Sequence, residues 1–296
     1  MHPYKLFFLL YVICIIPTGN AETVVSYPMD IRTTGVHHYH NYFQELLQLS
    51  LEKTRDTFGN YKIIVAPGLL TPKRSIAAAE QDLYPNLVFE MAYDAEYDAI
   101  PGVDFILFPV DLGIMGRRVC FINPSIKETI KQARTLADLT KYTIGQGLNW
   151  VDSIILRHNG LRVREIDGFE NIFKMLVGGR IDLFCHGSNQ FLSEYNSHKG
   201  QMNLVYDETF ELQYLLPRFF YLNSKNPELK QRIETGLKLA YYDRSLLKLW
   251  QKHFKESLDF ANLPQRKIFF LTNPLLKDLS KDWEQYVYKP ESVTSK

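Results

Sequence analysis

The chain has 296 residues, 46% of them apolar and 23% charged, which is enough apolar surface for a large core and excludes a disordered protein. Its 34 lysines and arginines nearly balance its 33 aspartates and glutamates. A chain this close to neutral gives no electrostatic reason to bind nucleic acid or an anionic membrane.

The N-terminal segment has the pattern of an export signal. Lys5 precedes an apolar run over residues 6–16, and residues 19–21 are Gly-Asn-Ala, small enough for a cleavage site. The run is shorter than the roughly 20 residues that a transmembrane helix needs. We therefore expect a signal peptide at residues 1–21, a mature chain that starts near Glu22, and a periplasmic location.

The cysteines leave two alternatives open. Cys14 follows the bulky Ile13, whereas lipidation needs a small residue there, so we expect soluble export, with a retained anchor as the alternative. Cys120 and Cys185 lie in apolar, strand-like segments. They could pair in an oxidising compartment, but buried free thiols are the state that this setting favours.

The first half of the chain alternates strands and helices. We predict strands at residues 23–27, 61–66 and 87–91. A polar and aromatic loop at 28–40 precedes a helix whose apolar face holds Phe43, Leu46, Leu47, Leu51 and Phe58.

The second half continues the alternation. Strands are predicted at 118–122, 142–145, 180–185 and 218–222. Asn226 with Pro227 begins a helix, because proline is favoured at the first helical position, and Asp243 begins another. The whole pattern predicts an α/β fold with mainly parallel strands.

The stretch from Thr135 to Tyr195 is the most specific. It holds Leu136-Ala137-Asp138-Leu139, then a strand with a Gly145–Gly147 turn before a helix, then Gly179-Arg180-Ile181-Asp182 before another strand. This order resembles the second lobe of type II periplasmic solute-binding proteins, the extracellular solute-binding protein family 3 group. The resemblance implies a two-lobed fold, each lobe a mixed, mainly parallel sheet flanked by helices, that closes on a small solute.

The resemblance also implies the lobe boundaries. We expect lobe 1 to comprise residues 22–117 and 218–285, lobe 2 to comprise 118–217 with the crossing segments, and 286–296 to form a flexible tail. Two crossing strands between lobes make a natural hinge.

Candidate ligand-binding residues lie near predicted strand ends or in the turns that follow them, where ligands bind in open α/β sheets. Asn149 is a predicted N-cap, with Asp152 completing a capping box, and exposed N–H groups at such a helix start attract anions or carbonyl oxygens. Trp150 could stack on a flat ligand or simply be buried, and Arg74 and Arg118 could grip carboxylates or be solvated. The full set is Tyr39, Tyr42, Arg74, Tyr93, Arg118, Gln146, Trp150, His186 and Asn189.

The chain departs from the amino-acid receptors that it resembles. Those receptors carry an arginine for the α-carboxylate and an aspartate for the α-ammonium, and the matching positions here are Tyr97 and Gly187. We therefore expect a ligand other than an ordinary α-amino acid.

Metal binding and thiol catalysis have weaker support in the sequence. Three histidines at positions 37, 38 and 40 could hold a metal, but no second cluster matches them, so an aromatic and polar wall is favoured. Cys185 and His186 are strand neighbours that point to opposite faces and cannot pair as nucleophile and base.

The sequence thus predicts an exported protein that captures a small polar or aromatic solute, with no cofactor, metal or catalytic residues. Its partner would be an inner-membrane permease of an ABC-type importer or a sensor domain, and the protein would be a monomer. The alternatives are an enzyme or a regulatory sensory protein on the same scaffold.

Overall fold

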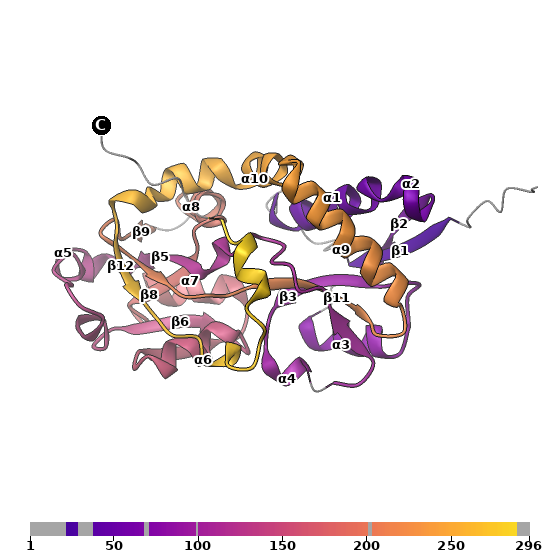
Figure 1. Cartoon of the computed structure of the whole chain (residues 1–296). Coiled ribbons are helices and arrows are strands. Elements are labelled where there is room, and N and C mark those ends of the chain that lie inside the picture. The colour runs from indigo at the N-terminus through magenta and orange to yellow at the C-terminus, as the bar shows by residue number, and fades with distance from the viewer. Residues whose placement is uncertain (1–21, 29–37, 68–70, 99, 201–202, 289–296) are drawn as a thin grey trace, which may run out of the picture.

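The computed structural model describes residues 22–28, 38–67, 71–98, 100–200 and 203–288. The expected leader and residues 289–296 of the expected tail lie outside these ranges. The expected start of a flexible tail at residue 286 is wrong, because Tyr286 is buried in the lobe 1 core. Figure 1 shows two lobes, with helix α10 lying across both of them. Within the described residues, no helix is long and apolar enough to cross a membrane.

Lobe 1 is built on five strands. The parallel pair β1 (Thr23–Pro28) and β2 (Tyr61–Ala66) is joined to β3 (Val88–Ala92) by a parallel bridge between Ser26 and Leu87. Strand β11 (Arg218–Asn223) lies between β3 and β4 (Val103–Phe105) and is antiparallel to both. Its helices are α1 (His38–Lys53), α2 (Arg55–Phe58), α3 (Pro72–Glu80), α4 (Ala95–Asp98) and α9 (Pro227–Tyr242).

Lobe 2 is built on a seven-stranded sheet, ordered β12-β10-β5-β8-β6-β7, with β9 also paired to β5. The strands are β5 (Arg117–Ile122), β6 (Thr143–Gly147), β7 (Arg162–Ile166), β8 (Leu183–Gly187), β9 (Val205–Tyr206), β10 (Phe210–Gln213) and β12 (Lys267–Phe270). Its helices are α5 (Lys127–Ile130), α6 (Val151–His158), α7 (Phe169–Val177) and α8 (Phe191–His198). Short 3₁₀ turns complete the chain at Ile114–Gly116, Pro124–Ile126, Leu136–Leu139, Leu263–Gln265, Pro274–Leu276 and Asp282–Tyr286.

The expected two-lobed α/β fold is confirmed, and the sheets are mixed for a simple reason. Among the described strands, every antiparallel pair includes β5 or β11, the strands that follow the two crossings between lobes. The other pairs of named strands, β1–β2, β6–β7, β6–β8 and β10–β12, are parallel. Each lobe is therefore a parallel α/β unit with one antiparallel strand inserted into it. This strand is β5 in lobe 2 and β11 in lobe 1, each directly after a crossing between the lobes.

One expected boundary needs correction. The assignment of 218–285 to lobe 1 included Lys267–Phe270, but this segment is β12, which pairs in parallel with β10 in the lobe 2 sheet. A free edge on β10 exposes unpaired backbone groups, and β12 covers it. The chain then returns, because Trp283 is buried in the lobe 1 core.

Helix α10 (Ser245–Ala261) ties the lobes together. Its first half buries Trp250 and Phe254 in the lobe 1 core, whereas Ala261 is buried in a core cluster of lobe 2. The Ser257 hydroxyl donates to the carbonyl of Ser188 at 2.7 Å and accepts from the Leu192 N–H at 3.1 Å. The lobes thus share a helix as well as two crossing segments.

The expectation of free thiols is wrong, because Cys120 and Cys185 form a disulfide. Strands β5 and β8 pair antiparallel in a register that sets Cys120 directly opposite Cys185. Both residues are fully buried at the centre of the lobe 2 sheet. The register, which the sequence does not display, is what brings them together.

Gly236 lets α1 and α9 pack at close range. A Cβ at this position would lie 1.9 Å from the carbonyl oxygen of Ser50 in α1. We predict that Gly236→Ala lowers the free energy of unfolding by about 2 kcal/mol, because overpacking against backbone outweighs the roughly 1 kcal/mol that alanine adds to a helix. Chemical denaturation measures the change.

Gly200→Ala is the matched control, because a Cβ at Gly200 meets nothing within 4 Å. It should leave the free energy of unfolding within about 0.5 kcal/mol of the original. Equal stability of the two variants would show that α1 and α9 have room to separate without cost.

Candidate functional site

A cavity of about 660 Å³ lies between the lobes. Strand β3, the N-terminus of α3 and α4 line it from lobe 1, and the starts of α6 and α7, the end of β8 and one face of α8 line it from lobe 2. Its lining residues include Glu90, Tyr97, Met115, Arg118, Trp150, Asp152, Phe169, Glu170, His186, Glu194, His198 and Arg218.

Aromatic rings form the lobe 2 wall of this cleft. The Trp150 ring lies 5.4 Å from the His186 ring at an interplanar angle of 29°, and the buried Phe184 ring lies 5.3 Å from the imidazole and 6.4 Å from Trp150. Phe169 lies 5.9 Å from His186. Such a wall offers ring faces to an apolar or flat ligand.

The position of Trp150 depends on a glycine. A Cβ at Gly147 would lie 2.3 Å from the indole, so the ring can cover this strand end only because the residue is glycine. The predicted turn at Gly145–Gly147 is wrong, because both glycines belong to β6 and pair with β7. Gly145 is required for a different reason, because a Cβ there would lie 2.3 Å from the Ile181 side chain.

A buried ion pair lies on the cleft floor. The Arg118 guanidinium lies 2.7 Å from an Asp152 oxygen, with 2% and 8% of the two side chains exposed. Tyr214 accepts a hydrogen bond from Arg118 Nε at 3.0 Å and donates its hydroxyl hydrogen to the same Asp152 oxygen. Burial raises the pKa of Tyr214 well above its usual value, so the phenol stays a neutral donor.

The predicted capping box is therefore wrong. Helix α6 begins at Val151, Asn149 has a left-handed backbone with φ of 62°, and the N-cap position belongs to Trp150 without a side-chain cap. Asp152 turns to Arg118 instead. A buried guanidinium attracts the carboxylate more strongly than exposed backbone N–H groups do.

A second arginine pairs with a carboxylate on the lobe 1 side. Arg218 Nη2 lies 3.7 Å from Glu90 Oε1, and Tyr27 donates to the other Glu90 oxygen at 2.6 Å. Both ion-pair partners are mostly buried. The two cleft arginines are thus already engaged with acids of the protein.

Two histidine–glutamate contacts occupy the lobe 2 side. His186 Nδ1 lies 2.7 Å from Glu194 Oε1. His198 contacts the backbone carbonyl of Glu194 through Nδ1 at 2.8 Å and Glu170 Oε2 through Nε2 at 3.1 Å. The ring of His198 also stacks on Phe173 with centroids 3.7 Å apart.

The structure brings together only some of the predicted residues. Arg118, Trp150 and His186 line the cleft. Gln146 and Asn189 are buried and are not among its lining residues, and Gln146 donates to the Cys185 carbonyl at 3.0 Å.

The lobe 1 candidates lie elsewhere. Tyr42 is fully buried and donates to the Val110 carbonyl, and Tyr93 is packed against Phe105. Arg74 is exposed on α3. Tyr39 falls in the first turn of α1, which begins within the expected loop, but its side chain is outside the description.

Sequence reasoning missed the acidic residues of the cleft. Glu194 and His198 share one face of α8 with Gln190 and Ser197, a spacing of four, seven and eight residues that marks a polar helix face. Glu170 lies in the first turn of α7, directly after β7. These periodic polar positions after a predicted strand were the available signal.

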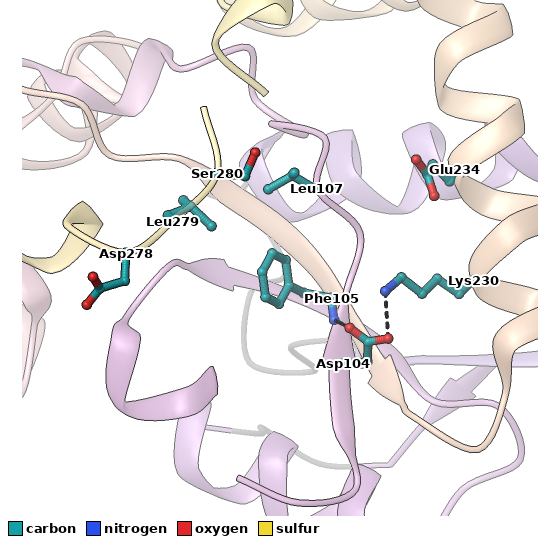
Figure 2. A pocket seen from close by; sticks show the side chains of 8 residues that line it. All are labelled: Asp104, Phe105, Leu107, Lys230, Glu234, Asp278, Leu279 and Ser280. Carbon is teal, nitrogen blue, oxygen red and sulfur yellow. Dashed lines mark hydrogen bonds and ion pairs between the residues drawn. The ribbon is translucent and has the colours of Figure 1, made fainter. Parts of the chain in front are cut away.

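A smaller cavity of about 320 Å³ lies in lobe 1. Figure 2 shows the side chains that line it. It lies between β4, α9 and residues 278–280. Lys230 bridges it by an ion pair of 2.6 Å to Asp104. The residues that line it come from one lobe and its C-terminal segment, so closure of the two lobes would not enclose it.

Within the described residues, no group of three or more histidine, cysteine, aspartate or glutamate side chains could hold a metal ion. His37 and the side chains of His38 and His40, which suggested a metal, lie outside the description.

No protein-family profile matches the chain, and no curated protein matches it in sequence. Solved structures do match in fold. The GluR0 ligand-binding core in complex with L-glutamate superposes with a TM-score of 0.57 at 13% identity, over 79% of this chain and 98% of that one. A periplasmic His/Glu/Gln/Arg/opine family-binding protein from Silicibacter pomeroyi in complex with lysine gives 0.55 at 13% identity, over 79% and 98%.

A third match is the ancestral amino acid-binding protein AncCDT-1, a precursor of cyclohexadienyl dehydratase. Its TM-score is 0.54 at 17% identity, over 79% of this chain and 95% of that one. Sequence identities this low show a shared fold and nothing beyond it. That fold is the type II periplasmic solute-binding fold.

Proposed function

We propose that this protein is an exported solute-binding protein that captures one small solute in the cleft and delivers it to an ABC-type importer or a sensor domain. The observation that carries the proposal is a cavity of about 660 Å³ lined from both lobes, with an aromatic wall at Trp150, Phe169 and His186. Small-molecule sites typically measure roughly 300–1,000 Å³ and combine apolar walls with a few placed polar groups.

The ligand in this proposal is not an ordinary α-amino acid. Tyr97, at the position of the usual arginine, lines the cleft and brings no positive charge. Gly187, at the position of the usual aspartate, has no space for a side chain: a Cβ would lie 2.6 Å from Asn189 Oδ1 and 3.0 Å from Met115 Sδ. A zwitterion loses water at both charged ends and needs a partner for each.

Capture would close the lobes about the segments that lead into β5 and β11. Hinges of this kind absorb motion in a few residues at element ends. Helix α10 limits the motion, since its hydrogen bonds to Ser188 and Leu192 hold it to lobe 2 while Trp250 anchors it in lobe 1.

Export to the periplasm is part of the proposal. A disulfide between Cys120 and Cys185 fits an oxidising compartment. The structural match from Silicibacter pomeroyi is itself described as periplasmic.

An enzyme on the same scaffold is the second candidate. His186 Nδ1 and Glu194 Oε1 lie 2.7 Å apart in the cleft, which brings a potential base and a potential acid together. Recovery of the bound ligand unchanged favours a binding protein, whereas chemical conversion of the ligand favours an enzyme.

The decisive experiment is a thermal-shift screen of the protein against a broad panel of metabolites. A cleft ligand at one hundred times its dissociation constant should add about 2.7 kcal/mol to the free energy of unfolding. Trp150→Ala should weaken binding of each such ligand at least tenfold, because it removes the central ring of the wall. Mass spectrometry then tells whether the ligand is recovered intact.

Phe270→Ala is the matched control, since this ring is 71% exposed on β12 and away from the cleft. It should leave affinity unchanged. Small-angle scattering with the ligand should show compaction. Ligands that bind equally well to both variants, without compaction, would contradict capture in the cleft.

A further inference from the structure

The charges of the cleft do not cancel, and the excess lies on one residue. The described lining holds two arginines and four carboxylates. Arg118 pairs with Asp152, and Arg218 pairs with Glu90. These two pairs contribute no net charge.

The contact between His198 and Glu170 is neutral as a pair as well. The carbonyl oxygen of Glu194 can only accept, so His198 Nδ1 must carry a hydrogen. The contact from Nε2 to Glu170 then needs a second hydrogen between these two groups. Whether that hydrogen belongs to the imidazolium or to the carboxyl, the pair has no net charge.

Glu194 is the carboxylate that remains. Its Oε1 lies 2.7 Å from His186 Nδ1, but that nitrogen has no hydrogen-bond partner among the described residues, so the contact is not a hydrogen bond. Its Oε2 is buried and has no hydrogen-bond partner among the described residues, although only 10% of the side chain is exposed. A buried negative charge without a full set of partners is costly, and proteins normally pair such a charge.

The wall next to Glu194 suits a cation on an apolar body. The rings of Trp150 and Phe169 lie 5.4 Å and 5.9 Å from the His186 ring that touches Glu194, and 6.2 Å from each other. Ring faces attract organic cations and accept apolar groups. A carboxylate on the ligand would find no free arginine among the described lining residues, because Arg118 and Arg218 are held by acids of the protein.

We propose that the cleft selects a ligand with one positive charge, an apolar or aromatic body and no carboxylate, held by Glu194 against the Trp150 wall. The proposal rests on the cleft being the solute site, as proposed above. The ligand class is then an organic monoamine, whose ammonium supplies the charge that the cleft lacks.

Four probes that share a phenylethyl group test this directly: phenethylamine, phenylalanine, 3-phenylpropionate and 2-phenylethanol. Isothermal titration of the unaltered protein should show phenethylamine binding at least tenfold more tightly than the other three. Glu194→Gln should remove at least tenfold of the phenethylamine affinity and leave 2-phenylethanol unchanged. Glu128→Gln, an exposed lobe 2 carboxylate outside the cleft, is the matched control and should change neither.

The four titrations of the unaltered protein test the proposed ligand class even if Glu194→Gln fails to fold. A preference for phenylalanine or 3-phenylpropionate, equal binding of all four probes, or binding of none overturns the proposal. If an anion or zwitterion binds and Trp150→Ala abolishes its binding, the cleft is still the solute site and only the ligand class is wrong. If neither these probes nor the metabolite panel bind, the solute-binding function fails as well.

Discussion

Replacing Asp152 with alanine is expected to lower the free energy of unfolding by about 3–5 kcal/mol, the cost of breaking a buried ion pair by removing one partner. Arg118 is 2% exposed, and its 2.7 Å contact with Asp152 compensates its charge inside lobe 2. Tyr214 would lose the acceptor of its hydroxyl in the same change. Because the pair borders a cavity that water can enter, the lower end of the range is expected. Urea denaturation of the ligand-free protein measures it.

Two further variants sharpen this test. Adding Arg118→Met to Asp152→Ala should restore most of the lost stability, since removing both charges leaves none uncompensated. Asp259→Ala breaks the exposed pair with Lys255, whose side chains are 63% and 64% exposed, and should cost under about 1 kcal/mol. A loss for Asp152→Ala no larger than that for Asp259→Ala would show that water compensates Arg118 fully.

Removing the disulfide should have a comparable effect. The bond closes a sequence separation of 65 residues, and loop-closure entropy for that length corresponds to about 4 kcal/mol at 25 °C. The double variant Cys120→Ala/Cys185→Ala should therefore unfold at a clearly lower denaturant concentration than the oxidised protein.

Reduction of the unaltered protein during unfolding is the natural comparison. It removes the cross-link but keeps both sulfur atoms, so agreement with the double alanine variant within about 1 kcal/mol assigns the loss to the cross-link rather than to core packing. If oxidised and reduced protein unfold at the same denaturant concentration, the cross-link does not stabilise the fold.

The regular elements of the fold were accessible from the sequence. Strands at Thr23–Pro28, Tyr61–Ala66 and Arg218–Asn223 lie within a residue of their predicted ends. Their apolar runs are bounded by glycine, proline or asparagine, which fixes such elements locally. The helix over Pro227–Tyr242 begins where Asn226 and Pro227 predicted it.

Contacts between distant segments were not accessible in this way. Residues 267–270 were not among the predicted strands, and only the three-dimensional arrangement shows β12 beside β10 rather than in lobe 1. Asn149 and Asp152 have the spacing of a capping box, and nothing nearby in the sequence shows that Arg118 takes the carboxylate. The same holds for Glu194 and His186, which meet across β8 and α8.

The sequence by itself determined the α/β alternation and, through its resemblance, the two-lobed arrangement, and it carries the expectation that Tyr97 and Gly187 replace the usual amino-acid clamp. Those features depend on residue type and on periodicity along the chain, which are local. The tertiary structure alone decided that Cys120 meets Cys185, that Arg118 and Arg218 are already paired, and that one Glu194 oxygen has no hydrogen-bond partner among the described residues. Each of these depends on strand register or on the approach of distant side chains, which a one-dimensional pattern does not encode.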